Sequence, residues 1–178
     1  MLRPTCHTGV MSDDVSDERL RLAGRRLDAL QARIDAGGPW PLAARFDNDP
    51  EASWGPMELL AHVAEMLPYW LGEVERIVAA PSEPVAFGRV GSDAVRIALI
   101  GRDRTLPTGE LYTRIDAWLE RWRHRLASLT QAQRAKVGLH PTRGEMSVDA
   151  IVERMIVNHM DEHVDQLESI LDNGSQPG

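Results

Sequence analysis

Apolar residues recur at steps of three and four along four separate stretches of the chain. In the first stretch, residues 16–36, the repeating apolar positions are Leu20, Ala23, Leu27, Leu30 and Ile34. This spacing predicts one apolar stripe on an amphipathic helix, with charged residues on the opposite face. The segment Gly37-Gly38-Pro39 follows directly and favours an end of the helix there.

The second stretch covers residues 56–79 and begins with Pro56, which suits the first helical position because that position needs no backbone N–H. Glu58 follows within the first turn and is placed to reach back to the helix start. The apolar face is wide and consists of Leu59, Leu60, Val63, Met66, Leu67, Trp70, Val74 and Ile77. His62 lies on the edge of this face, one turn from Leu59 and one turn from Met66.

Two further helices are predicted in the second half of the chain. The third covers residues 109–130, with apolar positions at Leu111, Ile115, Trp118, Leu119, Trp122, Leu126 and Leu129. The fourth begins after a Ser147 cap and runs to residue 171. Its apolar positions are Val148, Ile151, Val152, Met155, Ile156, Met160, Val164, Leu167 and Leu171.

The connections between these helices differ in length, and this bears on the topology. Residues 80–107 form a connection much longer than an antiparallel helix turn needs, and residues 92–100 within it are typical of a short helix with a Ser or Asp cap. No alternating strand pattern and no internal repeat is recognised. The sequence therefore predicts an all-α four-helix bundle. The long link favours helices 2 and 3 running parallel, with helices 2 and 4 antiparallel.

Two histidines, His159 and His163, lie four residues apart in the last helix. Residues with this spacing lie on the same face of a helix, so their imidazoles can converge on one metal ion. The zincin motif H-E-x-x-H has the same spacing, but position 160 is Met, so the general base of a zincin is missing. The pair alone is a weak signal, because histidines on a charged helix face meet this spacing by chance.

His62 is a candidate third ligand for this pair. It lies early in the second helix, whereas the pair lies late in the fourth helix. If these helices are antiparallel neighbours, the two levels differ by about four residues, or ~6 Å along the axis. The predicted fold therefore permits a site of three histidines.

Composition narrows the classes of function. The net charge of −7 and a pI near 5.3 leave no overall basic character for binding nucleic acid. No apolar run approaches the ~20 residues that a membrane span needs, and the N-terminus lacks the apolar core of a signal peptide. Cys6 is the single cysteine, which excludes an intramolecular disulfide. We expect a cytoplasmic protein with one bundle domain at residues 15–172, between a flexible leader at 1–14 and a flexible tail at 173–178.

Two segments resemble a known family. The segment Trp54–Glu65, which contains His62, resembles the first histidine segment of the DinB-like (YfiT-like) metalloenzyme superfamily. The segment beginning at His140 and running on to Ile170 resembles the closing signature of that superfamily. The resemblance implies an up-down-down-up four-helix bundle that frequently dimerises. It also implies a divalent metal ion (zinc, nickel, iron or manganese) held at His62, His159 and His163.

The resemblance also implies a class of chemistry. Three histidines leave metal coordination positions open for water or substrate, unlike a closed structural zinc site. Characterised relatives include transferases and isomerases that use mycothiol, bacillithiol or glutathione, so the first hypothesis is a metal-dependent thiol transferase or isomerase acting on a small molecule. The alternative is a non-catalytic, metal-stabilised bundle that binds a small molecule or a protein. A weaker alternative is a metal-dependent hydrolase, for which Glu65 is the only candidate general base.

Other polar residues near these segments have plainer interpretations. Glu65, one turn after His62, is either a hydrogen-bond partner of that histidine, an additional ligand or a solvated side chain. His140 is assigned to the family signature and not to the metal site. Asp161 and Glu162 are expected to be solvated. Arginines on the long connection are candidates for binding anionic substrate groups, namely Arg89, Arg96 and Arg102.

Overall fold

The protein is described by a computed structural model that places residues 9–43 and 51–174. Its long helices are α1 (Gly9–Gly37), α2 (Pro56–Ala79) and α4 (Thr108–Ser128). The last long helical run is built from α6 (Val148–Val152), a π-helical turn η2 (Glu153–Val157) and α7 (Asn158–Gly174). The shorter elements are η1 (Glu51–Ser53), β1 (Val85–Ala86), α3 (Ala94–Asp103), α5 (Gln131–Arg134), β2 (Val137–His140) and β3 (Gly144–Ser147).

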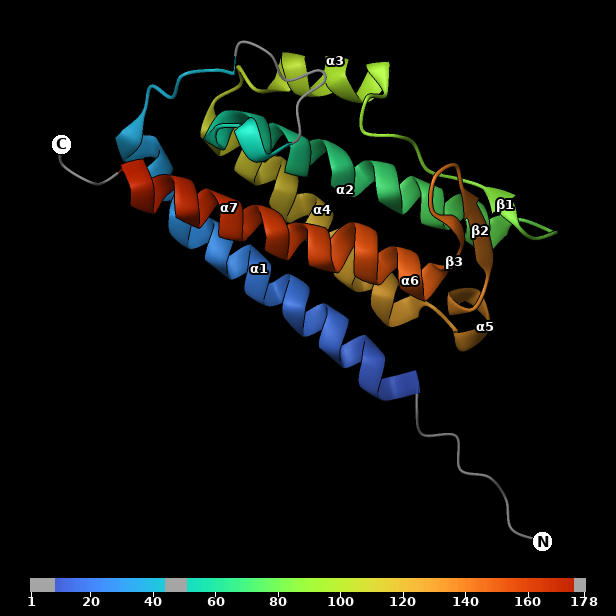
Figure 1. The fold of residues 1–178 in the computed structure, drawn as a ribbon. Helices are drawn as coiled ribbons and strands as arrows, with labels where there is room; N and C mark the ends of the chain where they lie inside the picture. Colours follow the sequence, from blue (N-terminus) through green and yellow to red (C-terminus); the bar gives the residue numbers. More distant parts are fainter. Residues whose placement is uncertain (1–8, 44–50, 175–178) are drawn as a thin grey trace, which may run out of the picture.

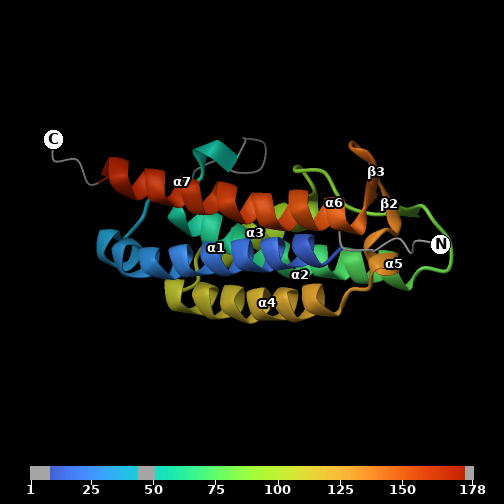
Figure 2. The ribbon, with the colours of Figure 1, turned by 90° about the horizontal axis from the view of Figure 1, so that it is seen from below.

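The four long helical segments lie side by side as a bundle (Figures 1 and 2). The α2 helix packs against α4 and α7, and α1 packs against α4 and α7. The chain leaves the end of α2 through β1 and returns along the bundle through α3, so that α4 starts at the same end as α2 (Figure 1). The topology is therefore up-down-down-up, as the sequence predicted.

The core lies between these four helices and consists of the predicted apolar stripes. On α2, for example, Leu59, Val63 and Ile77 are almost fully buried. Two hydrogen bonds cross the core from large aromatic side chains to backbone carbonyls of neighbouring helices. The Trp122 indole donates to the Leu67 carbonyl at 2.9 Å, and the Tyr112 hydroxyl donates to the Leu27 carbonyl at 3.1 Å. These bonds satisfy buried polar atoms that would otherwise be costly.

A small sheet at one end of the bundle corrects the expectation of a chain without strands. β1 pairs in parallel with β2, and β2 pairs antiparallel with β3, with Leu139 opposite Glu145 and His140 opposite Gly144. The strands are two to four residues long. Alternation over so few residues cannot be distinguished from a loop, which is why the sequence pattern did not predict them.

The helix boundaries agree closely with the sequence prediction except at the N-terminus. The α2 helix begins at Pro56 and ends at Ala79, and Asp93 caps α3 by accepting from the Arg96 backbone N–H at 2.9 Å. The α1 helix begins at Gly9, so residues 9–14, which were expected to belong to a flexible leader, are helical. The expectations for 1–8 and 175–178, including any role of Cys6, concern residues outside the described part. None of the described helices has the length and apolar character that crossing a membrane requires.

Candidate metal centre

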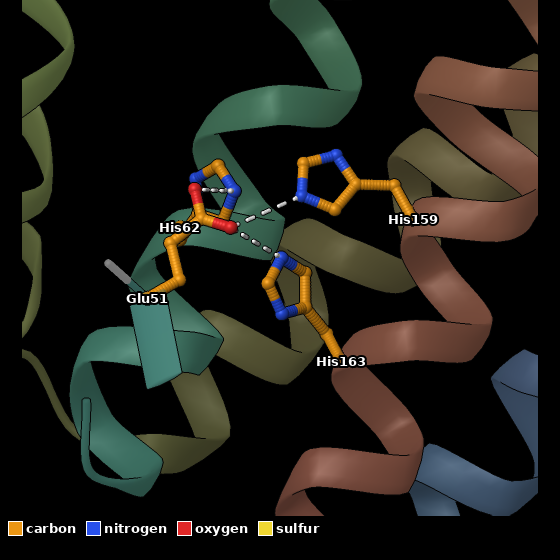
Figure 3. A group of neighbouring side chains, drawn as sticks. All are labelled: Glu51, His62, His159 and His163. Atoms are coloured by element: carbon orange, nitrogen blue, oxygen red, sulfur yellow. Dashed lines mark ion pairs between the residues drawn. The ribbon is translucent and has the colours of Figure 1, made fainter. Parts of the chain in front are cut away.

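Three histidines and one glutamate converge between α2, α7 and η1. His62 comes from α2, His159 and His163 come from α7, and Glu51 comes from η1 (Figure 3). One ligand atom from each of these residues lies within 4.8 Å of the ligand atoms of the other three. The structure therefore brings together the three histidines that the sequence singled out and adds a carboxylate.

The carboxylate of Glu51 faces the three imidazoles. Its Oε1 lies 3.6 Å from Nε2 of His62, and its Oε2 lies 3.5 Å from Nε2 of His159. The same Oε2 lies 3.8 Å from Nε2 of His163 (Figure 3). The Nε2 atoms of all three rings therefore point to one region, which is the arrangement that a shared ligand needs.

The histidines reach the same level because α2 and α7 are antiparallel neighbours. The ring centroid of His62 lies 5.2 Å from that of His159 and 4.9 Å from that of His163. His62 and His163 are buried, whereas His159 is partly exposed. The offset of ~6 Å along the axis estimated from sequence therefore does not separate them.

Neighbouring side chains fix the orientation of this group. Gln166 lies one turn after His163, with its Oε1 3.4 Å from Nδ1 of His163, and its amide donates to the Glu51 backbone carbonyl at 2.6 Å. The indole of Trp54 packs edge-on against His62, with 5.4 Å between the ring centroids. Partners of this kind on the far nitrogen of a metal-binding histidine commonly fix its tautomer and ring orientation.

Arg96, from α3, provides a positive charge at the edge of the group. Its guanidinium forms an ion pair with Glu51 and lies 3.4 Å from Nε2 of His62. It also donates to the Gly91 carbonyl at 2.8 Å, which ties the loop before α3 to the site. The side chain is almost fully buried, so this charge is weakly screened by solvent.

Burial controls the protonation of the histidines. Burial and the nearby charge of His163 lower the pKa of His62 well below its usual value. Burial and the charge of His159 lower the pKa of His163 to about 4. Burial acts to raise the pKa of Glu51, but the hydrogen bond and charge of His159 outweigh it and lower that pKa to about 2. At neutral pH the buried imidazoles of His62 and His163 are therefore neutral, and the carboxylate of Glu51 is ionised.

The residues fit a divalent cation. Nε2 of His163 is a buried polar atom without a hydrogen-bond partner in the described part of the chain, and it points at the same region as the other ring nitrogens. A buried polar atom in this state is costly unless something binds to it. Neutral imidazoles are the most common metal ligands from protein side chains, and a carboxylate adds the negative charge that a cation favours.

Comparison with known proteins supports the fold. No protein-family model matches the sequence, and no curated protein is significantly similar to it. Among solved structures, YfiT from Bacillus subtilis matches with a TM-score of 0.69 and 13% sequence identity, covering 99% of this chain and 95% of the YfiT chain. YfiT is described as a probable metal-dependent hydrolase with an unusual four-helix bundle topology. The chain has the YfiT fold. This confirms the fold that the DinB-like resemblance implied.

Within this YfiT fold, the other acidic candidates lie away from the convergence point. Glu65 is buried 3.9 Å from Nδ1 of His62, is not part of the cluster of ligand atoms, and forms an ion pair with Arg89 at 2.6 Å. Asp161 is not freely solvated, because it forms an ion pair with Arg19 of α1 at 2.6 Å. Glu162 forms an ion pair with Arg154 at 2.9 Å and is not part of the histidine and glutamate cluster.

Glu51 is the functional candidate that the sequence reasoning missed. It lies in a short 3-10 turn before α2, where no periodic pattern indicates which way a side chain points. The available signal was an acidic residue shortly before Trp54, in the segment that leads into the first histidine motif. A carboxylate in a loop is normally solvated, so this signal is weak without the contacts to Arg96 and Gln166.

A cavity of about 420 Å³ opens beside this group. Its lining residues are Glu51, His62, Trp70, Arg89, Val90, Gly91, Arg96, His140, Thr142, Arg143, Arg154, Met155, His159 and Glu162. Of the arginines proposed from sequence, Arg89 and Arg96 line the cavity. Arg102 does not, because it points to solvent and pairs with Asp103 at 2.6 Å. His140 lines the cavity but is not part of the histidine and glutamate cluster.

Proposed function

We propose that the protein is a metal-dependent hydrolase of small molecules, with a divalent cation held by His62, His159 and His163. The observation that carries this proposal is the carboxylate of Glu51, which lies 3.5 to 3.8 Å from the Nε2 atoms of the three histidines. The weakness of hydrolysis as a hypothesis was the lack of a general base, since Glu65 was the only candidate. Glu51 meets that need, and Glu65 is engaged by Arg89.

Each residue then has a definite role. A divalent cation in such a site supplies Lewis acidity, which lowers the pKa of water and polarises an acyl or phosphoryl oxygen. The three imidazoles would hold the cation and leave coordination positions open for substrate. Glu51 is ionised at neutral pH; it would take the proton of the attacking water and pass it to the leaving oxygen as the ester or phosphoryl bond breaks. Arg96 orients Glu51 through its ion pair.

The description of YfiT as a probable metal-dependent hydrolase agrees with this proposal. At 13% identity the likeness itself establishes the fold alone. The proposal therefore depends on the residues of this chain, and above all on the position of Glu51.

The deciding experiment measures metal content and turnover together. Protein purified without a histidine tag is analysed for zinc, nickel, iron and manganese, and the loaded forms are tested with para-nitrophenyl acetate. Glu51→Gln is expected to keep the metal and to lose at least about a hundredfold in kcat, the usual scale of a lost general base. Loss of the metal in this variant would make Glu51 a ligand and contradict its role as base.

Thiol transfer is the second candidate function, on the same metal site. No cysteine is among the described residues that line the cavity, which is compatible with a thiol that enters as cosubstrate. Cobalt-substituted protein titrated with glutathione, and with mycothiol or bacillithiol, tests this candidate. A thiolate bound to cobalt gives an intense charge-transfer absorption; an unchanged spectrum would exclude it.

Two further expectations belong with these proposals. We propose that the chain acts in the cytoplasm and that it forms a homodimer; sedimentation of the purified protein would test the homodimer. A stoichiometric metal that stabilises the fold, with no turnover of any ester or thiol, would instead support the non-catalytic alternative.

A further inference from the structure

The tip of the β2–β3 hairpin borders the cavity next to the histidine cluster. His140 pairs with Gly144 across the hairpin, and Pro141, Thr142 and Arg143 form the turn between them. Gly144 has φ of +74°, a backbone conformation that glycine adopts without strain. Both Thr142 and Arg143 line the cavity. This hairpin belongs to the segment that resembles the family signature, and the proposed hydrolytic chemistry does not use it.

The side chain of His140 contacts the backbone of the hairpin tip. Nδ1 of this buried histidine accepts a hydrogen bond from the Thr142 backbone N–H at 3.3 Å. Its ring lies among aromatic neighbours, 5.4 Å from the Phe87 ring and 6.4 Å from the Trp70 ring, measured between centroids. Burial, with the charge of Arg143, lowers the pKa of His140, so the ring remains a neutral acceptor at neutral pH.

The loop that carries Arg89 packs against the side chain of His140. Gly88 has φ of +81°, and a Cβ atom at this position would overlap the imidazole of His140. The Gly88 N–H also donates to Glu73 on α2 at 2.5 Å. Arg89 follows directly, with its guanidinium 3.7 Å from the centre of the Tyr69 ring. The two segments of the cavity wall that carry Arg89 and Arg143 are therefore both in contact with His140.

The charges on the cavity wall are mostly positive. The lining contains Arg89, Arg96, Arg143 and Arg154 against two glutamates, in a chain whose net charge is −7. Arg96 pairs with Glu51, and Arg154 pairs with Glu162. Arg89 pairs with Glu65, which is not part of the lining.

Arg143 differs from the other three arginines. It is exposed and forms no ion pair with any residue that the structure describes. A concave, partly desolvated wall of this kind concentrates positive potential and attracts anions.

We propose that the cavity binds a small molecule bearing a carboxylate or phosphate group, which Arg143 and Arg89 hold while the reacting part of the same molecule lies at the histidines and Glu51. This assignment of the substrate class rests on the proposed hydrolase function. The guanidinium groups supply paired N–H donors, which match the oxygen atoms of both anions. The anionic group is thereby bound at the hairpin, apart from the metal ligands.

The binding test uses inorganic phosphate and succinate as separate probes, measured by calorimetry on metal-free and metal-loaded protein. At least one probe is expected to bind the metal-free protein, and Arg143→Gln is expected to weaken that binding about tenfold, the scale of a lost charge-assisted hydrogen bond. Arg143→Lys should retain part of the affinity. Arg102→Gln is the control, because Arg102 is an exposed arginine that lies outside the cavity. Selective binding of phosphate or of succinate assigns the anion class.

Three results would overturn the inference. Binding that disappears with the metal would place the anion on the cation itself. An equal loss of affinity in Arg102→Gln would show general attraction to surface charge. If neither phosphate nor succinate binds the metal-free or the metal-loaded protein, the cavity has no anion site.

Turnover separates this inference from the proposed function. If hydrolysis of para-nitrophenyl acetate requires both the metal and Glu51 but neither anion binds, the proposed hydrolase function is supported and the proposed substrate class is wrong. If phosphate or succinate binds through Arg143 but no ester is hydrolysed, the proposed anion site is supported and the proposed hydrolase function is wrong. With both present, Arg143→Gln is expected to raise KM for an anionic ester about tenfold, and the control Arg102→Gln is expected to leave that KM unchanged.

Discussion

The Gln166 amide donates to the Glu51 backbone carbonyl at 2.6 Å, which joins α7 to the turn that precedes α2. The two residues are 115 positions apart, and the same glutamine contacts Nδ1 of His163 at 3.4 Å. One side chain therefore sets both the orientation of a histidine and the position of the carboxylate opposite it.

Replacing this glutamine is expected to weaken the metal site without unfolding the bundle. Gln166→Leu removes the contact to His163 and frees the Glu51 turn, so metal affinity should fall about 10- to 100-fold, as is usual for loss of a residue that orients a ligand. Competition with a chelating dye measures this affinity. Gln131→Leu, at an exposed position of α5, is the control, and equal effects of the two changes would contradict a specific role for Gln166.

Each of the three histidines is expected to be necessary for stoichiometric metal. His159→Ala and His163→Ala remove ring nitrogens that lie 3.5 and 3.8 Å from the Glu51 carboxylate. Metal content per chain after dialysis should fall well below one equivalent in each variant. His124→Ala, an exposed position on α4, should leave the content unchanged. Unchanged metal content in His159→Ala would refute the ligand assignment.

The metal-free protein is expected to lose stability as pH falls through the slightly acid range. Burial lowers the pKa of His163 to about 4, below the usual value of 6.5, so the unfolded chain binds a proton between these values and the folded chain does not. The free energy of unfolding should therefore decrease as pH falls from 6.5 to about 4, by on the order of 3 kcal/mol from this residue.

Urea unfolding at several pH values measures this effect. His163→Gln should reduce the dependence across the window, the remainder coming from His62, whose pKa is also lowered by burial, while His124→Gln should follow the wild type. The pKa of Glu51 is lowered to about 2, so its contribution is present above pH 4.5 and is lost only below that value, toward pH 2. A slope between pH 6.5 and 4 that is the same in His163→Gln and the wild type would contradict the assignment.

Away from the site, Tyr112→Phe tests a polar contact within the core. The change removes a buried hydroxyl that donates to the Leu27 carbonyl at 3.1 Å and leaves that carbonyl with one partner fewer. The free energy of unfolding should fall by about 1 to 2 kcal/mol, the usual cost of such a bond. Leu22→Ala, at a half-exposed position on α1, is the control and should change stability by less.

Part of the metal centre could be predicted from sequence because it depends on helices. The α2 helix has a proline at its start and a wide apolar face, so its ends and the place of His62 follow from local pattern. The spacing of His159 and His163 fixes their common face in the same way. Antiparallel packing of the two helices then brings the three together, and the length of residues 80–107 indicated that packing.

The rest of the centre depends on contacts that the sequence pattern does not encode. Glu51 lies in a non-periodic turn, and its direction is set by Arg96 from α3 and by Gln166 from α7. The hairpin that carries Arg143 is too short for alternation to be visible. The start of α1 at Gly9 precedes the first residue of the predicted apolar stripe, so no periodic signal marked it.

The π-helical turn at Glu153–Val157, immediately before His159, sets a rotational offset in the last helix. One residue of an α-helix corresponds to about 100° of rotation around its axis. A π turn accommodates one additional residue, so the segment after it faces a direction that an uninterrupted helix with the same start would not give. Deleting one residue from this turn would therefore misdirect either the apolar stripe of α6 or both histidines of α7, and the length of the turn is as important to the site as the identity of its ligands.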